Sequence, residues 1–239
     1  MTADTLAKIK MKVYAKLSLD EGTIQKILPQ ADVVGPIKRY DLANDCAENY
    51  AVIIIIDGQF HNNLAVSCDE IRDALHRGTK IYGAASMGAL RASELDSCGM
   101  IGHGEIYEHI KVTPYFRDDW LGQVFVEKAG RVHTLIPPFV DFYFNLKSLL
   151  QLEEISRKEF GIMTKSSADL FYSERSWDKV KAAINREKCR QPAKLLAIAE
   201  RAWHQMGSQK QRDALSLCKK VQRDLQKIAA ANQKLNWAL

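Results

Sequence analysis

Short apolar runs alternate with amphipathic segments in the first hundred residues, and this alternation predicts the first part of the fold. Four runs are typical of β-strands: 11–16, 31–34 together with Ile37, 52–56, and the run that starts at Lys80. Residues 52–56 are five β-branched residues in succession, apolar on both faces. Only a central strand that helices cover on both sides requires that composition.

Helical segments lie between these strands. Residues 18–21 and 67–70 both have the S-x-x-E spacing of a capping box that opens a helix. The first helix should end before Pro29, and the second should end at Gly78. Residues 39–49 carry a shorter helical pattern. The resulting β-α-β-α-β-α-β-α order predicts an α/β fold, with a parallel Rossmann-like sheet, right-handed crossovers and flanking helices.

Beyond the fourth helix the periodicity is mostly helical. We expect a loop over 99–104 and then a short helix or strand over 105–112. The apolar stretch 139–150 predicts a helix that packs against the sheet. Further helices should follow, with Pro192 opening one and Gly207 separating the last two.

Positive charge is concentrated in the C-terminal part of the chain. Residues 1–150 hold 16 Lys and Arg against 19 Asp and Glu, whereas residues 151–239 hold 18 against 10. We therefore predict an α/β domain over 1–150 and a basic α-helical C-terminal region over 151–239. Such asymmetry can mark a nucleic-acid surface. Acidic residues lie between the basic ones and aromatic residues are not interleaved, which favours a solvated face or an acidic protein partner over nucleic acid.

Composition also argues against several classes of site. The five cysteines form no C-x-x-C pair, and the closest histidines, His103 and His109, do not share a helical face, so we expect reduced thiols, no metal site and no cofactor. The longest apolar run, 51–56, is far shorter than the roughly 20 residues that cross a bilayer. The N-terminus lacks a signal peptide. We expect a cytoplasmic protein that does not contact membranes.

The most informative stretch for function is the strand-to-helix turn at Ser86. The pattern Ala84-Ala85-Ser86-Met87-Gly88 resembles the elbow of hydrolases, in which small residues on both sides expose a nucleophilic serine. The first helical amides, those of Met87 and Gly88, would point at the group that the serine attacks, and the helix dipole favours an anion there. This pattern predicts a nucleophile beside an oxyanion hole.

A second segment should reach the same edge of the sheet. The strand before Asp57 and the strand before Ser86 both deliver their next residues to the carboxyl edge, although the spacing leaves open whether the two strands are neighbours. His61 is the candidate general base, and Asp57 could orient it or bind substrate together with Gly58. Arg91 could pair with a carboxylate or phosphate of the substrate.

Each candidate also has a purely structural interpretation. A serine between a strand and a helix is most often an N-cap, and Ser86 could be one, or it could anchor a ligand without reacting. Asp57 could simply begin a loop, and His61 could be an exposed loop histidine. Arg91 and Glu94 have the spacing of an i,i+3 ion pair. Spacing alone leaves both interpretations open.

At these residues the chain resembles the TfuA-like protein family. The resemblance lies in two blocks, and weaker similarity extends from about Lys12 to about Leu150. The first block runs from Ile56 through His61 and Ala65-Val66-Ser67 to Glu70-Ile71, and the second runs from Gly83 to Arg91 with Glu94-Leu95, Gly99-Met100 and Gly104.

The resemblance implies a function in peptide-backbone thioamidation. TfuA-like proteins accompany YcaO enzymes, which use ATP to activate a backbone amide. Their implied activity is hydrolysis of a thiocarboxylated, ubiquitin-like ThiS-type carrier, which releases sulfide. The implied partners are therefore a YcaO-type enzyme and a ThiS-like carrier. The alternative is a non-catalytic α/β binding module that recruits or allosterically activates the YcaO enzyme.

Two positions depart from the family pattern. The family's first strand usually ends in Gly-Pro before a Ser or Thr, whereas this chain has Lys16-Leu17 before Ser18. The expected Arg-x-Gly-Asp appears as 38–41, with Tyr40 in place of the glycine. Side chains at Lys16 and Leu17 are expected to crowd the carboxyl edge of the sheet.

Overall fold

The computed structural model describes residues 9–60, 64–129, 131–187 and 191–236. The chain forms two compact units, one made of residues 1–114 and 210–239 and the other of residues 115–209. These bounds differ from the division that charge and periodicity suggest, so the domains 1–150 and 151–239 stay a prediction.

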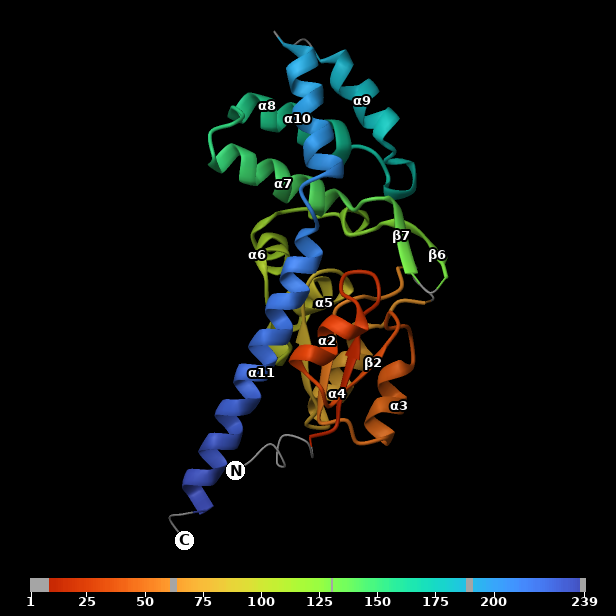
Figure 1. The fold of residues 1–239 in the computed structure, drawn as a ribbon. Coiled ribbons are helices and arrows are strands. Elements are labelled where there is room, and N and C mark those ends of the chain that lie inside the picture. The colour runs from red at the N-terminus through yellow and green to blue at the C-terminus, as the bar shows by residue number, and fades with distance from the viewer. Residues whose placement is uncertain (1–8, 61–63, 130, 188–190, 237–239) are drawn as a thin grey trace. The chain divides into compact units, whose positions relative to one another are not determined.

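The first unit contains a five-stranded sheet in which every pairing is parallel (Figure 1). The strands are β1 (Met11–Tyr14), β2 (Ala31–Val34), β3 (Val52–Ile55), β4 (Lys80–Gly83) and β5 (Ile101–Gly102), in the order β2-β1-β3-β4-β5. All four residues of β3 are buried, which explains the apolar run on both faces. The parallel α/β sheet expected from the sequence is thus confirmed.

The order of the strands locates the crevice where such sheets bind ligands. An order of 2-1-3-4-5 is the flavodoxin-like version of the doubly wound fold, and its direction reverses between the first and third strands. The carboxyl ends of β1 and β3 therefore flank this switch point. Asp57 follows β3 and Ser18 follows β1, so both lie there.

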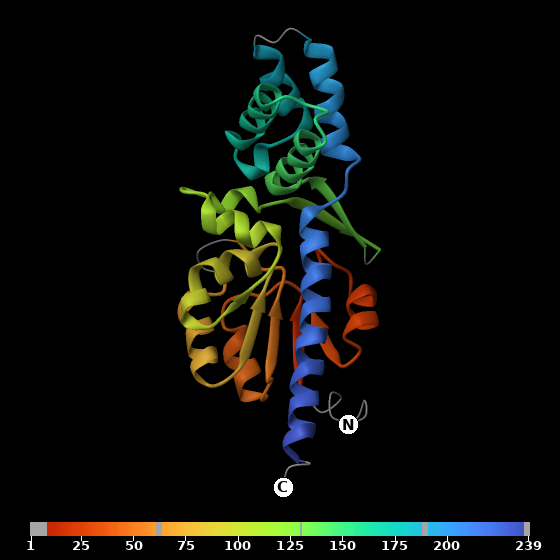
Figure 2. The same cartoon turned by 90° about the vertical axis from the view of Figure 1, so that its left-hand side faces the viewer.

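Helices cover both faces of this sheet. They are α2 (Glu21–Ile27), α3 (Asp41–Ala47), α4 (Cys68–His76), α5 (Met87–Leu95), α6 (Glu105–Val112) and α11 (Gln209–Asn236). The apolar side of α11, with Leu217, Val221 and Leu225, shares one core with α2 and with Ile54 and Tyr82 of the sheet. Figure 2 shows α11 running along the sheet. The C-terminal helix thus belongs to the α/β core.

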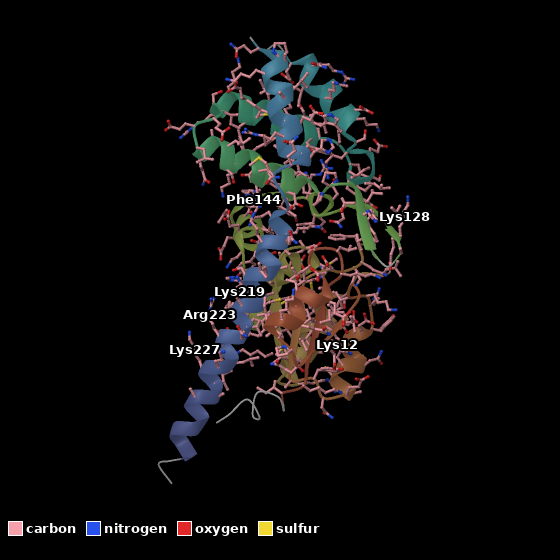
Figure 3. The ribbon with its side chains drawn as sticks, viewed as in Figure 1. Lys12, Lys128, Phe144, Lys219, Arg223 and Lys227 are labelled. Carbon is pink, nitrogen blue, oxygen red and sulfur yellow. The ribbon has the colours of Figure 1, made fainter. Side chains whose placement is uncertain are left out.

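The other side of α11 carries the positive charge. Lys219, Arg223 and Lys227 are exposed at i, i+4 and i+8, and they form a row along the helix (Figure 3). Asp224, on an adjacent row, binds Lys220 at 2.8 Å and accepts a hydrogen bond from Tyr82. This arrangement fits the solvated basic face that the sequence suggests.

One helix start expected from the sequence is wrong and another is confirmed. Asp20, not Ser18, caps α2, because its carboxylate accepts the Thr23 amide at 2.9 Å. The hydroxyl of Ser18 is instead directed to Asp57. Ser67 and the side chain of Glu70 form the predicted capping box of α4.

The loop expected over 99–104 contains a short strand. Residues Ile101 and Gly102 pair with Tyr82 and Gly83 as β5, and α6 follows as a helix. Two residues are too few to carry a periodic pattern, so only the exposed edge of β4 defines this strand.

In its described residues, the second unit combines a hairpin with four α-helices. These elements are β6 (Val124–Lys128), β7 (Arg131–Ile136), α7 (Phe139–Gln151), α8 (Arg157–Ala168), α9 (Trp177–Arg186) and α10 (Pro192–His204). Phe142, Leu146 and Leu149 of α7 form a core with α8, α9 and α10. These residues of α7 thus contribute to a core within their own unit, and the packing of this helix against the sheet stays a prediction.

A buried ion pair links two segments of the second unit. The guanidinium of Arg175 is fully buried and lies 3.0 Å from the carboxylate of Asp119. It also donates to the carbonyls of Ser167 and Leu170. Burial lowers the pKa of Arg175 to about 10, and the nearby Asp119 opposes this shift.

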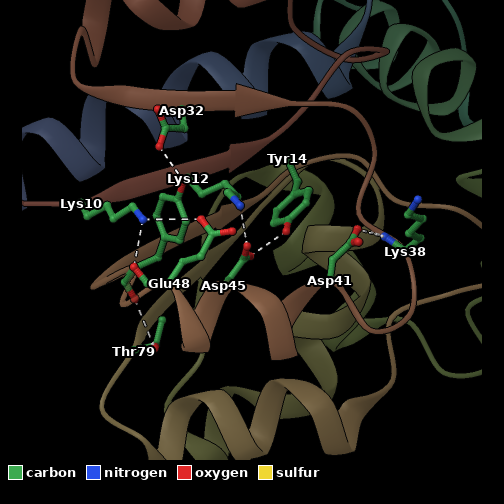
Figure 4. A network of polar contacts seen from close by, with 10 residues as sticks. Lys10, Lys12, Tyr14, Asp32, Lys38, Asp41, Asp45, Glu48 and Thr79 are labelled. Carbon is green, nitrogen blue, oxygen red and sulfur yellow. Dashed lines mark hydrogen bonds and ion pairs between the residues drawn. The ribbon is translucent and has the colours of Figure 1, made fainter.

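A buried carboxylate connects β1 to α3 in the first unit (Figure 4). Asp45 is 1% exposed, accepts the Tyr14 hydroxyl at 2.6 Å and lies 2.6 Å from the ammonium of Lys12. Burial, with the hydrogen bond to Asp45, raises the pKa of Tyr14. Because charge and hydrogen bonds satisfy it on two sides, this carboxylate acts as a structural link.

The described residues include no helix that is both long and apolar enough to cross a membrane.

Candidate functional site

The structure makes β3 and β4 direct neighbours, which sequence spacing could not decide. Ile55, the last residue of β3, pairs with Gly83, the last residue of β4. Asp57 and Ser86 therefore follow adjacent strands at the same carboxyl edge. The predicted convergence of the two segments on one edge of the sheet is confirmed for this part of the chain.

The carboxylate of Asp57 binds the loop that follows β1. Its Oδ2 accepts the successive backbone amides of Lys16, Leu17 and Ser18 at 3.0, 2.8 and 2.8 Å, and its Oδ1 accepts the Ser18 hydroxyl at 2.5 Å. Successive amides of this kind form a concave anion site. In this chain that site is filled by an internal carboxylate, which is 1% exposed.

This arrangement changes the interpretation of Asp57. A carboxylate has about four acceptor positions, and the four donors from the loop occupy most of them. The side chains of Lys16 and Leu17 are exposed and half-buried, so their backbone, rather than their side chains, fills the crevice at the switch point. Asp57 thus positions the loop between β1 and α2, and a role in orienting a base remains a prediction.

The turn before Ser86 is strained. Ala85 has a φ of +66°, and the amide of Ser86 donates to the carbonyl of Ala84 at 2.9 Å, which closes a three-residue turn. A left-handed conformation is costly for a residue with a side chain. Strain of this kind tends to occur at functional sites, where the surrounding structure holds it in place.

Ser86 occupies the N-cap position of α5 without acting as a cap. Its φ and ψ are −116° and −116°, and within the described chain its hydroxyl accepts no capping hydrogen bond. The carbonyl of Ser86 accepts the Leu90 amide at 3.2 Å. The structural interpretation of this serine as an N-cap is therefore not supported, and the residue is only 3% exposed.

Glycines allow the elements around Ser86 to approach closely. A Cβ on Gly88 would lie 1.8 Å from the carbonyl oxygen of Ile55, and one on Gly83 would lie 2.2 Å from the carbonyl oxygen of Gly88. A Cβ on Gly58 would lie 2.6 Å from the Cβ of Met87. These contacts bring the start of α5 against the ends of both strands.

The amides at the start of α5 are the candidate oxyanion donors. The Gly88 amide donates to the carbonyl of Ile56 at 3.3 Å, so it is already engaged. Among the described residues, no backbone acceptor is found for the amides of Met87 and Ala89. These two groups, at the positive end of the helix dipole, can bind a developing negative charge.

Arg91 is bonded to two other groups of the protein. Its Nε donates to the carbonyl of Val66 at 2.9 Å, and its guanidinium lies 2.7 Å from Glu94. The thiol of Cys68 donates to the same carboxylate, and burial together with this hydrogen bond raises the pKa of Cys68. Arg91 therefore fastens the start of α4 to α5, and its role in substrate binding stays a prediction.

Two histidines are candidates for the base of this site: His61, predicted from the sequence, and His103, which follows β5. His61, the candidate base, lies outside the described residues. His103 follows β5, donates its amide to the carbonyl of Gly83 at 3.0 Å, and has its Nε2 2.8 Å from the hydroxyl of Ser216. Burial, reinforced by Lys220 and Arg223, lowers its pKa. Sequence reasoning missed this second histidine at the same edge because it did not predict β5.

Other features of the first unit lie away from this site. The described residues contain no group of three or more His, Cys, Asp or Glu side chains that could hold a metal ion. A pocket of about 200 Å³ lies at the opposite, amino edge of the sheet, where Ala51 and Thr79 precede β3 and β4. The Ser86 turn and the Asp57 loop therefore remain the candidate site.

Comparison with known proteins agrees with the geometry. No curated protein matches the chain. The family model described as TfuA-like protein matches residues 57–176, a segment that begins at Asp57 and includes the Ser86 turn and α5. This match covers half of the chain, which therefore belongs to the TfuA-like family.

Proposed function

We propose that this chain hydrolyses a thiocarboxylated ThiS-like carrier at the Ser86 turn and so supplies sulfide to a YcaO-type enzyme. Membership of the TfuA-like family suggests a role associated with thioamidation. The hydrolysis and the two partners are the steps that we add to this role.

The observation that carries the proposal is the position and bonding of the Ser86 hydroxyl. Its hydroxyl is not used as a helix cap, it follows a strained residue, and it stands beside the amides of Met87 and Ala89. A nucleophile that is next to helix-terminal donors is suited to acyl transfer, because negative charge develops on the carbonyl oxygen.

The proposed reaction converts a carrier thiocarboxylate and water into a carrier carboxylate and hydrogen sulfide. The Ser86 hydroxyl attacks the thiocarboxylate carbon while its proton passes to a base, for which His61 is our candidate. The C–S bond then breaks and sulfide leaves with a proton, which gives an acyl-serine. Water cleaves this ester, which restores the hydroxyl and leaves the carboxylate on the carrier.

The burial of Ser86 limits which substrates can reach it. With 3% of the residue exposed, wide side chains have no access to the hydroxyl. A tail that ends in Gly-Gly presents only backbone and is narrow enough for such a site. This fit supports a protein carrier over a bulky small molecule.

The direct test measures the intact mass of a thiocarboxylated ThiS-type carrier during incubation with the purified protein. We expect the carrier mass to change from thiocarboxylate to carboxylate over many turnovers, and Ser86→Ala to lose at least about 100-fold in rate. Ser93→Ala is the matched control, because that hydroxyl lies in the same helix and donates to the carbonyl of Leu90. A full rate in Ser86→Ala would remove this residue from the reacting centre.

The alternative is a non-catalytic module that clamps the carrier and activates the YcaO enzyme. One observation favours it, namely that four donors from its own chain occupy most of the acceptor positions of Asp57, as in a structural residue. Carrier turnover at a substoichiometric amount of protein separates the two functions, since a clamp converts none.

A further inference from the structure

An exposed tyrosine occupies a backbone conformation that belongs to glycine. Tyr40 has φ and ψ of 73° and −3°, and the amide of Asp41 donates to the carbonyl of Lys38 at 3.3 Å. These values define a type II turn with Tyr40 at its third position, where a positive φ normally requires glycine. For a bulky residue such a φ is a genuine outlier.

The neighbouring backbone holds this turn in place without using the ring of Tyr40. The Tyr40 amide donates to the Glu70 carboxylate at 2.5 Å, and the Lys38 amide donates to the Asp41 carboxylate at 2.9 Å. Figure 4 shows the contact between Lys38 and Asp41. Tyr40 itself is 68% exposed. The folded chain would lose no core contact if a glycine stood at this position.

The turn is attached to the candidate site. Ile37 donates its amide to the carbonyl of Asp57 at 2.9 Å and forms a parallel bridge with Gly58. Gly58 in turn lies against Met87, the residue after Ser86. Residues 37–41 therefore form part of the rim around the carboxyl edge of β3.

A cation and an apolar side chain accompany the tyrosine on this rim. The guanidinium of Arg39 lies over the Tyr40 ring, 5.5 Å from its centroid. The Arg39 amide donates to the carbonyl of Leu64 at 2.8 Å, and Leu64 is 48% exposed. Arg39 forms no ion pair with the described carboxylates. We call Arg39, Tyr40 and Leu64 the rim patch.

We propose that the rim patch docks the protein carrier, and that Tyr40 and Arg39 determine its recognition. This inference rests on the proposed function, because the occupant is the carrier whose tail reaches Ser86. Tyrosine and arginine dominate the binding free energy of many protein interfaces. A strained, exposed tyrosine that lies over no core is explained by a partner that covers it. The exposed guanidinium beside it calls for a carboxylate on the carrier, close to where its tail begins.

The test measures the dissociation constant of a purified ThiS-type carrier in its carboxylate form, labelled with a fluorophore at its N-terminus, for the full-length protein. The carboxylate form is not turned over, so binding is measured apart from chemistry. We expect Tyr40→Gly and Arg39→Gln each to weaken binding about tenfold or more. Tyr40→Phe should bind within about twofold of the native chain, because it keeps the ring.

Thermal unfolding distinguishes docking from a structural role. Tyr40→Gly relieves the positive φ, so its midpoint should stay the same or rise while carrier binding falls. Tyr115→Gly is the matched control, since Tyr115 has a φ of +60°, is 96% exposed and belongs to the other compact unit. Its carrier affinity should not change.

The outcomes separate this inference from the proposed function. If the carrier binds through Tyr40 and Arg39 but is never hydrolysed, the docking patch stands and the hydrolase proposal fails. If the carrier is hydrolysed and Tyr40→Gly leaves its affinity and KM unchanged, the docking patch is wrong and the hydrolase proposal stands. Loss of YcaO binding with native carrier binding would also overturn the assignment of the occupant.

Discussion

Replacement of Asp57 is the most informative change for the candidate site. In Asp57→Ala, the amides of Lys16, Leu17 and Ser18 and the hydroxyl of Ser18 all lose their acceptor. Because these donors form the loop between β1 and α2 at the switch point, the variant tests whether that loop is held by this carboxylate alone.

The expected loss in the free energy of unfolding depends on how exposed each donor is. A hydrogen bond to a charged group contributes about 1.5–3 kcal/mol, and a buried donor left without a partner costs about 1–3 kcal/mol. Lys16 is exposed and Leu17 is half-buried, so water can replace much of the carboxylate there, whereas Ser18 is 6% exposed. We therefore expect Asp57→Ala to destabilise the first unit by about 3–5 kcal/mol, most of it from the two buried Ser18 donors that lose their acceptor.

The amide variant should cost less. In Asp57→Asn, the oxygen can still accept the three loop amides, and the new NH₂ group can donate to the Ser18 hydroxyl. The charge is lost and the Ser18 hydroxyl loses the acceptor for its proton, while the three amides keep theirs, so we expect the free energy of unfolding to fall by about 1–2 kcal/mol. Asp20→Ala is the matched control, because it removes a carboxylate that accepts a backbone amide at an exposed N-cap, at a cost of about 1 kcal/mol.

The assay is native-state hydrogen exchange, analysed by mass spectrometry of peptides that cover residues 15–19. This local measurement is needed because the two compact units need not unfold together. Protection of the Leu17 and Ser18 amides should fall most in the alanine variant. If the free energy of unfolding in urea and the free energy of opening from exchange both stay within about 0.5 kcal/mol of the native chain, the claim that Asp57 holds this loop is refuted.

Three further predictions follow from packing, burial and charge. Gly88→Ala places a methyl group against the carbonyl of Ile55, at the carboxyl end of the central strand, and should destabilise the chain by about 3 kcal/mol in urea unfolding. Burial lowers the pKa of His103 below its usual 6.5, so folding favours the neutral ring. The resulting stabilisation is complete above about pH 6.5 and is lost as pH falls below it. In His103→Gln the urea midpoint should therefore depend less on pH in this range. Burial raises the pKa of Cys218 to about 12, so in the native protein at pH 8 this thiol should resist iodoacetamide while the exposed Cys98 reacts, as peptide mapping would show.

Much of the α/β unit could be predicted from local patterns. The β-branched run at 52–56 required a covered central strand, and the Ser67 capping box placed the start of α4. The strand β5 could not be predicted, because its two residues form a strand only by pairing with the backbone of β4. The helix over 139–151 was predicted to within one residue, whereas its partners α8, α9 and α10 were not, since several surfaces could bury the same apolar side chains.

For the site, the residue types predicted which segments are involved, and the structure showed which bonds each of their side chains makes. By spacing alone Ser86 fitted a cap more readily than a nucleophile, and only the geometry shows that its hydroxyl makes no cap bond within the described chain. Arg91 was open to two roles, and the structure binds it to Val66 and Glu94. No local signal connected Asp57 with the loop of Ser18, because about 40 residues separate these partners.

The sequence by itself determined the alternation of strands and helices, the parallel sheet and the two segments that meet at its carboxyl edge. These follow from periodicity and turn chemistry, which depend on neighbours within a few residues. Only the tertiary structure decided that Asp57 fills the switch point, that α11 completes the core of the sheet, and that Tyr40 stands strained on the rim. Such facts depend on contacts between residues far apart in the chain, and on the free energy of burying one surface rather than another.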